Sequence, residues 1–352
     1  MYPKLIVDTK KYKHNVEKLL KLCHNFDISM MAVTKVFCAD SRLIDILEEC
    51  KVDYIADSRL LNLKNMKTSL PKVMLRLVSM HEVDEVVQHV DISLNSELMV
   101  IKAINDAAKK LNKIHKVILM IDIGDLREGI FYKENIIESV SAIESFTHVE
   151  LLGLGTNLTC YGGIIPTEDT LKRLIDITHF VENYLDRKLE LISGGNSSHL
   201  HLLFKNKKID KINNLRLGES LILGRETAFG DSISTLYQDV ITLEVDLIEI
   251  KYKPSIPEGD IGMDAFGKKP SFKDYGLMKR GILAIGKQDV DFHELIPVNE
   301  SIRLIGSSSD HIIVDLTNSK IDYQVGDIIK FKLSYGSLLS LMTSRYVGRV
   351  YI

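Results

Sequence analysis

The feature that most constrains the fold is an alternation, from about residue 28 to 220, of short apolar runs with longer stretches of helical period. Thr167–Asp186 is one helical stretch, with apolar residues at three- and four-residue steps and Pro166 before its start. Eight strand–helix units favour a (β/α)8 barrel. A doubly wound open sheet is the main alternative, but it usually has fewer strands and a glycine-rich phosphate turn after the first, which this sequence lacks. The predicted strands are Ser29–Lys35, Val52–Ser58, Lys72–Val78, Val90–Ser96, Lys116–Gly124, Val149–Thr156, Leu189–Gly195 and Asn214–Gly218.

The pattern changes after about residue 235. Leu243, Val245 and Leu247 alternate with polar or exposed positions, which is typical of a half-buried strand. We therefore expect a barrel over residues 1–235 and a mostly β C-terminal domain over residues 236–352. The strand Lys4–Asp8 precedes the first helix, and the sequence allows it to join either domain. Further strands are predicted at Arg280–Ile285, Ser301–Ile305, His311–Leu316, Ile328–Leu333 and Arg345–Ile352.

Composition excludes several function classes. Lys and Arg total 45 against 48 Asp and Glu, so the formal charge of −3 offers no basic field for nucleic acid or an anionic membrane. The first apolar run is too short for a signal peptide, and no stretch approaches the ~20 apolar residues of a membrane span. The four cysteines form no CxxC pair, which favours a reducing, cytoplasmic compartment.

Polar residues end the predicted barrel strands, where barrel enzymes carry their active sites. Lys35 ends the first strand after the apolar run Met30–Val33. Burial there would lower its pKa and leave a neutral amine able to form a Schiff base. The alternative is a strand-end lysine whose ammonium reaches solvent.

Ser193–Ser198 places two glycines, an asparagine and three serines between a strand and the predicted helix Ser198–Phe204. Glycines, hydroxyls and a helix N-terminus together suit a phosphate group, although an ordinary strand–helix turn with a serine cap would have the same composition. His199 and His201 lie on different faces of that helix, so we expect no metal site. Arg216 and Arg127 could each hold an anion or form a structural ion pair, Arg216 with Glu219 or Asp210.

A strand-end lysine, a Ser/Gly turn, an arginine on the eighth strand and a C-terminal β domain together resemble the alanine racemase family of pyridoxal-phosphate enzymes. The resemblance spans nearly the whole chain. Ala32-Val33-Thr34-Lys35 is similar to the family's cofactor motif, which implies that Lys35 binds the cofactor covalently. Leu215-Arg216-Leu217-Gly218 is similar to its Arg-Pro-Gly motif, which implies that Arg216 faces the pyridine nitrogen and Gly218 donates to the phosphate. The other cofactor contacts that it implies are Asn157, Ser193, Asn196, Ser197 and Tyr346.

The substrate residues diverge from alanine racemase itself. Ile121-Asp122-Ile123-Gly124 with Arg127 resembles the family's fifth-strand motif and implies that Arg127 lies beside the substrate carboxylate. The segment Gly262–Gly267 lacks the family's catalytic tyrosine. With Ser309-Asp310-His311 and Tyr335–Leu339 it resembles the ornithine racemase branch, which acts on a longer basic amino acid.

Racemisation needs acid/base groups on both faces of the substrate Cα. Lys35 would serve one face. For the other we expect His311 first, because His titrates near working pH, and Asp264 second, because burial would have to raise its pKa. Asp264, Asp310 and Asp125 are the candidates for an acidic partner of a basic, small-molecule substrate. The resemblance implies a homodimer in which each β domain completes the other subunit's site.

Three other functions remain open. A decarboxylase of the same fold would usually carry a cysteine in its second domain, and this chain has no cysteine after Cys160. A pyridoxal-phosphate-binding homeostasis protein would end near residue 230. An aldolase barrel without cofactor would leave the Ser/Gly turn and Tyr346 without a role.

Overall fold

The computed structural model describes residues 2–352 and divides the chain into two compact units. One unit is Lys10–Gln238, and the other combines the N-terminal residues up to Thr9 with Asp239–Ile352. The predicted boundary at 235/236 thus lies three residues from the observed one. The first residues were expected in the barrel, but they belong to the β unit. The reason is that the first strand, β1 (Lys4–Val7), pairs with strands of that unit.

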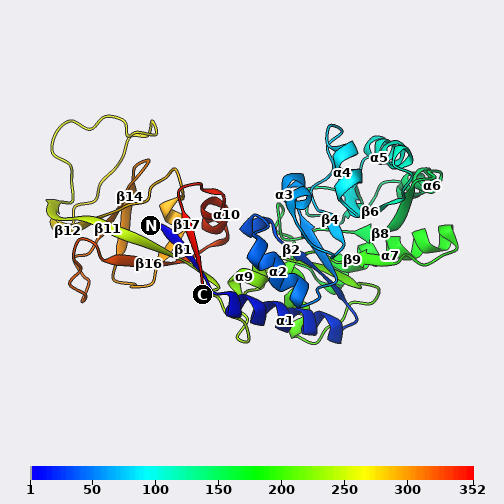
Figure 1. Ribbon diagram of the computed structural model, residues 1–352, viewed down its shortest axis with the longest axis horizontal. Coiled ribbons are helices and arrows are strands. Elements are labelled where there is room, and N and C mark those ends of the chain that lie inside the picture. The colour runs from blue at the N-terminus through cyan, green and yellow to red at the C-terminus, as the bar shows by residue number, and fades with distance from the viewer. Residues whose placement is uncertain (1) are drawn as a thin grey trace. The chain divides into compact units, whose positions relative to one another are not determined.

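The barrel unit contains eight parallel strands in the closed order β2-β3-β4-β5-β6-β8-β9-β10, with β10 pairing back onto β2 (Figure 1). This confirms the predicted (β/α)8 barrel and all eight predicted strands. A short additional strand, β7 (Ile130–Phe131), pairs with the end of β6. The barrel strands are β2 (Ser29–Val33), β3 (Tyr54–Asp57), β4 (Lys72–Met74), β5 (Ile92–Asn95), β6 (His115–Asp122), β8 (Val149–Gly155), β9 (Leu191–Ser193) and β10 (Asn214–Leu217).

Helices surround the strands (Figure 1). In the helix predicted at Thr167–Asp186, the Thr167 side chain accepts a hydrogen bond of 3.1 Å from the N–H of Thr170 and so caps the N-terminus. Its apolar face, including Leu171 and Leu174, is buried. The helices are α1 (Thr9–Asn25), α2 (Ser41–Glu49), α3 (Leu60–Asn65), α4 (Val83–His89), α5 (Leu98–Lys110), α6 (Ile136–Glu144), α7 (Glu168–Leu185), α8 (Leu200–Phe204) and α9 (Glu219–Leu223).

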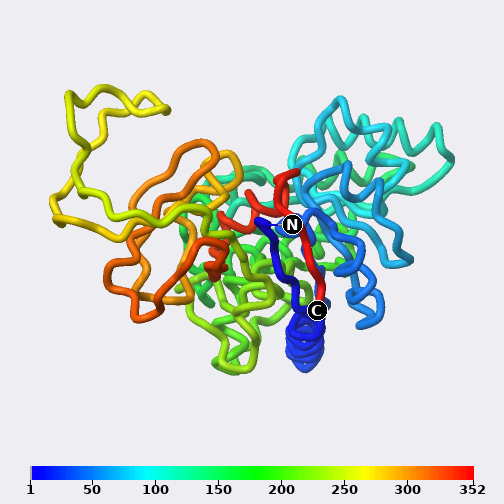
Figure 2. Tube along the Cα trace, turned by 60° about the vertical axis from the view of Figure 1, so that its left-hand side comes forward, coloured from blue at the N-terminus to red at the C-terminus, as the bar shows by residue number. Residues whose placement is uncertain are grey.

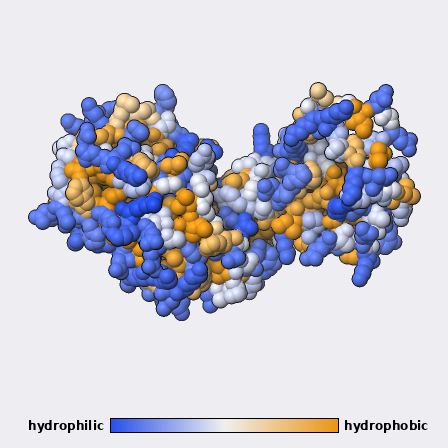
Figure 3. Space-filling view, turned by 180° about the vertical axis from the view of Figure 1, so that it is seen from behind, coloured by the Kyte–Doolittle hydropathy of each residue, from blue (hydrophilic) through white to orange (hydrophobic). Residues whose placement is uncertain are grey.

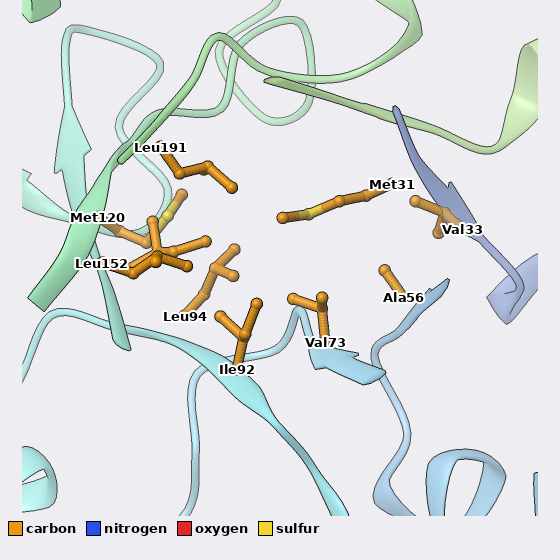
Figure 4. Packing of buried hydrophobic residues seen from close by; sticks show 10 residues of the cluster. Met31, Val33, Ala56, Val73, Ile92, Leu94, Met120, Leu152 and Leu191 are labelled. Atoms are coloured by element: carbon orange, nitrogen blue, oxygen red, sulfur yellow. The ribbon is translucent and has the colours of Figure 1, made fainter. Parts of the chain in front are cut away.

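Apolar side chains fill the interior of the barrel (Figure 4). They come from alternate positions of the strands, because successive side chains of a strand point to opposite faces. Since the interior is packed, polar chemistry is confined to the ends of the strands. The cluster comprises Met31, Val33, Ala56, Val73, Ile92, Leu94, Ile118, Met120, Leu152 and Leu191.

The β unit is an eight-stranded sheet whose main path runs β13-β16-β11-β12-β15-β14, with β1 and β17 attached through β11. Its pairs are antiparallel except β1 with β17, which lie side by side at the two ends of the chain (Figure 2). The sequence predicted six of these strands besides β1 but neither β13 nor the helix α10 (Tyr335–Thr343). The strands are β11 (Ile241–Pro254), β12 (Leu277–Leu283), β13 (Leu295–Pro297), β14 (Arg303–Ser307), β15 (Ile312–Asp315), β16 (Ile328–Leu333) and β17 (Gly348–Tyr351).

The helices of the described residues are all too short or too polar to span a membrane.

Candidate active site

The carboxyl ends of the barrel strands carry most of the predicted site residues. Lys35 follows β2, Arg127 follows β6, Asn157 follows β8, Asn196 follows β9, and Arg216 lies on β10. Because parallel strands of a barrel end at one rim, these side chains share the same end of the barrel. Hydrogen bonds between the loops connect Asn157 with Asn196 and with Arg216.

The turn that carries Lys35 is held by a buried network. Lys35 opens a 3-10 turn, η1 (Lys35–Phe37), directly after Thr34. The Thr34 hydroxyl donates to Asp57 Oδ2 at 2.5 Å, and the Thr34 N–H donates to the Ala56 carbonyl at 2.9 Å. Asp57 also accepts from Asn62 Nδ2 at 3.1 Å, so the carboxylate ties the ends of β2 and β3 together.

The Lys35 ammonium forms no hydrogen bond or ion pair with the residues of the described chain. Burial lowers its pKa, and the positive charge of Arg127 acts in the same direction. Cys160, Asp57 and Glu128 oppose the shift without cancelling it. A lysine with a lowered pKa and no partner can act as a nucleophile or a proton acceptor.

Two glycine turns meet beside this lysine. Asn196 caps the turn η2 (Ser197–His199): its Oδ1 accepts from the Ser198 N–H at 2.8 Å, and its Nδ2 donates to the Leu158 carbonyl at 2.8 Å. The Ser197 hydroxyl lies 3.0 Å from that of Ser220, which joins the turn after β9 to the start of helix α9, directly after β10 and Gly218.

The first of these turns leaves backbone donors unused. Gly195 has a φ of +117°, a conformation that favours glycine. A Cβ on Gly194 would lie 2.5 Å from Ile212 Cγ2. The N–H groups of Gly195 and Asn196 donate to no acceptor within residues 2–352. Unused N–H groups beside a serine hydroxyl suit a phosphate.

Arg216 lies beneath the two turns and is 6% exposed. Its Nη1 donates to Ser193 Oγ and its Nη2 to the Thr156 carbonyl, each at 2.5 Å, and Asn157 Oδ1 lies 3.5 Å from Nη2. Burial lowers the pKa of Arg216 to about 10. The sequence allowed a structural ion pair between Arg216 and Glu219. That alternative is wrong, because Glu219 pairs with Arg225 at 2.5 Å.

Arg127 is bound by its neighbour in sequence. Its Nε and Nη2 donate to the two carboxylate oxygens of Glu128, and its Nη1 donates to Cys160 Sγ at 2.9 Å. Burial acts to lower the pKa of Arg127, but the hydrogen bonds and charge of Glu128 outweigh it and raise the pKa. The Asn157 amide lies against the same guanidinium. No sequence motif predicts a site role for Glu128 or Cys160.

The loop that carries Arg127 is held by two aspartates. Asp122 Oδ1 accepts from the N–H of Gly124 at 2.8 Å and of Leu126 at 3.2 Å. Asp125 is buried and accepts from backbone N–H groups of Cys160, Tyr161 and Ile164. These three backbone hydrogen bonds occupy the carboxylate oxygens of Asp125, so this carboxylate is not available to a substrate ammonium.

The remaining predicted site residues lie in the β unit. Asp310 and His311 are exposed in the turn between β14 and β15. Tyr346 is 65% exposed. Asp264 is exposed as well, and hydrogen bonds from the N–H groups of Lys268 and Phe266 lower its pKa. That direction is opposite to the raised pKa that the sequence analysis required of Asp264 as an acid/base.

His199 and His201 point to backbone groups. His199 Nδ1 lies 3.3 Å from the Gly194 carbonyl, and His201 Nδ1 lies 2.6 Å from the Ser198 carbonyl. The described residues contain no group of three or more His, Cys, Asp and Glu side chains arranged to hold a metal ion.

Comparison with known proteins connects this site to one family. Residues 7–226 match the model of the alanine racemase N-terminal domain. The chain is 46% identical over 350 residues to the ornithine racemase of Acetoanaerobium sticklandii, and the match covers 99% of each chain. It is 37% identical over 354 residues to the lysine racemase of Thermotoga maritima, covering 100% of this chain and 99% of that protein.

Solved structures share the fold. The alanine racemase of Bartonella henselae with covalently bound pyridoxal phosphate matches with a TM-score of 0.76 at 17% identity, covering 100% of both chains. The D-threonine aldolase of Filomicrobium marinum matches with a TM-score of 0.74 at 12% identity, covering 99% of this chain and 92% of that one. The matches to the family model and to its curated relatives extend over the residues that form the barrel mouth, and the chain therefore belongs to the alanine racemase family.

Proposed function

We propose that this protein is a pyridoxal-phosphate-dependent racemase that interconverts L- and D-ornithine. The observation that carries the proposal is the half-buried Lys35 at the barrel mouth, which has no hydrogen-bond or ion-pair partner among the described residues, with Arg127 and the two glycine turns beside it. The similarity to an ornithine racemase over the whole chain supports the substrate.

The residues present fit this cofactor. Lys35 would bind it covalently, and the free N–H groups of Gly195 and Asn196 with the Ser197 hydroxyl would hold its phosphate, with Gly218 and Tyr346 as further expected contacts. Arg216 would donate to the ring nitrogen. Because its guanidinium keeps its own proton at working pH, Arg216 would leave that nitrogen unprotonated. When bound, the cofactor supplies an electron sink for the bonds at the substrate Cα.

This chain's own residues orient the substrate and move its proton. Arg127 would hold the α-carboxylate, since a guanidinium binds a carboxylate through two parallel hydrogen bonds. Lys35, once released, would take or return the Cα proton on one face, and its lowered pKa favours the neutral form that accepts a proton. His311 is our first candidate for the opposite face. Asp264 is a weaker one because its pKa is lowered.

We further propose that the active form is a cytoplasmic homodimer in which His311 of a second copy completes each site. Hydrophobic side chains exposed in the segment 256–277 support a partner surface there. Figure 3 shows hydrophobic residues interspersed with hydrophilic ones on the face in view. No disulfide joins any of the four cysteines in the part of the chain that the structure describes, which supports a reducing compartment. The exposed apolar side chains of this segment are Ile256, Ile261, Met263, Phe266, Phe272, Tyr275 and Leu277.

The test is incubation with pyridoxal phosphate and a panel of L-amino acids in heavy water, followed by separation of enantiomers and measurement of Cα deuterium. We expect deuterated D-ornithine. Amines as products would make the protein a decarboxylase, and no exchange would refute turnover. Lys35→Ala should abolish the absorbance band of the bound cofactor, whereas the exposed Lys67→Ala should keep it.

A further inference from the structure

Four carboxylates end or follow strands β3 and β6 near Lys35, and three are engaged by uncharged donors. Asp57 accepts from Thr34 and Asn62, and both Asp122 and Asp125 accept from backbone N–H groups. Glu128 differs, because its two oxygens accept from the cationic side chain of Arg127.

Glu128 lies against Arg127 and close enough to the other positive groups of the barrel mouth to act on them electrostatically. Its side chain is 16% exposed. Its negative charge acts on Lys35, Arg127 and Arg216 alike. The backbone fixes its position, since the next residue, Gly129, has a φ of +122° and a Cβ there would lie 2.5 Å from the Asp122 backbone nitrogen. Glu128 is thus a half-buried anion that is paired with one cation, Arg127, and influences two others that substrate and cofactor would engage.

The Arg127–Glu128 pair has the fork-to-fork geometry that a substrate carboxylate would need. Two parallel N–H···O bonds already occupy Nε and Nη2, and the remaining Nη1 faces a thiol, which is a weak acceptor. The other edge of the guanidinium, Nη1 with Nη2, faces Cys160 and the Asn157 amide. A substrate carboxylate that binds the Nε/Nη2 edge of Arg127 therefore takes the place of Glu128.

We propose that Glu128 determines the specificity for basic amino acids by exchange: the substrate α-carboxylate displaces it from Arg127, and it then pairs with the ammonium at the end of the substrate side chain. A dibasic amino acid brings one carboxylate and one distal ammonium, so both charges of the broken pair regain a partner. A neutral amino acid of equal length leaves the Glu128 carboxylate without a partner in a partly buried site, which is unfavourable. This inference rests on the proposed function for the identity of the substrate.

The test uses two ligands that lack an α-amino group and so cannot be racemised, 5-aminopentanoate and pentanoate, with binding to the holoenzyme measured by calorimetry. An unchanged cofactor absorbance at saturation shows that the distal amine of 5-aminopentanoate has not displaced Lys35 from the cofactor. We expect the wild type to bind 5-aminopentanoate about 10- to 100-fold more tightly, the range of one hydrogen-bonded charge. Glu128→Gln should remove this preference. Glu134→Gln, the same change at an exposed position of the same connection, should keep it. An unchanged cofactor absorbance and unfolding midpoint establish that Glu128→Gln is folded and loaded.

A Glu128→Gln variant that retains the preference would overturn the proposal. So would equal weakening of both ligands, because Glu128 would then only position Arg127. In parallel, the Glu128→Gln variant should have a lower kcat/KM for L-ornithine and a higher kcat/KM for L-norvaline than the wild type. If the wild type racemises neither amino acid, the proposed function fails, whereas the calorimetric preference still reports on Glu128 by itself.

Discussion

Acidification should destabilise the protein through one buried histidine beside the proposed phosphate turn. His199 is fully buried, its Nδ1 donates to the Gly194 carbonyl at 3.3 Å, and its Nε2 has no hydrogen-bond partner in the described residues. Burial lowers its pKa from 6.5 to about 4. The folded protein therefore keeps this imidazole neutral at pH values where the unfolded chain already protonates it.

The size of the effect follows from this difference in pKa. Because the folded-state pKa is the lower one, stability is lost as pH falls from 6.5 towards 4. A pH of 5 is about 1.5 units below the pKa of this histidine in the unfolded chain. At about 1.4 kcal/mol per unit, the free energy of unfolding falls by about 2 kcal/mol. His199→Asn retains an amide donor for the Gly194 carbonyl and cannot titrate in this range. Its free energy of unfolding should thus fall by about 2 kcal/mol less than that of the wild type between pH 7.5 and pH 5.

The assay is urea unfolding at both pH values, followed by far-ultraviolet circular dichroism. His179→Asn, the same change at an exposed position of α7, is the control and should retain the wild-type pH dependence. If His199→Asn loses as much stability on acidification as the wild type, burial of a neutral His199 does not explain the acid sensitivity.

Two further substitutions test the framework of the site. Gly194→Ala places a Cβ 2.5 Å from Ile212 Cγ2 and should destabilise the protein by about 1–3 kcal/mol. It should also weaken pyridoxal-phosphate binding, measured by absorbance titration. Gly306→Ala is the control: its Cβ would have no atom within 4 Å, so stability and binding should not change. Asp57→Asn replaces one acceptor oxygen in the network around Thr34 and should cost about 1–3 kcal/mol of unfolding free energy in urea; an unchanged stability would contradict the role of this network.

The barrel and its lysine could be predicted because both depend on local sequence. Each barrel strand is a short apolar run between helical stretches, and the strand-end rule then places Lys35 at the mouth. The N-terminal strand could not be assigned, because its partners Ile241–Glu244 and Gly348–Tyr351 are more than two hundred residues away. The strand β13 spans three residues and includes a proline, so it has too little alternation to be recognised.

Glu128 shows a different limit of sequence reading. In extended chain, neighbouring side chains point to opposite faces, so an adjacent Arg127 and Glu128 read as a solvated pair. Here Leu126 has a φ of +58° and Gly129 a φ of +122°, and the loop between them curves so that both side chains converge. On our proposal this loop carries both the arginine for the substrate carboxylate and the carboxylate for the distal ammonium. Substitutions at Glu128 should therefore change the preferred side-chain charge, while Lys35, which follows another strand, should still bind the cofactor.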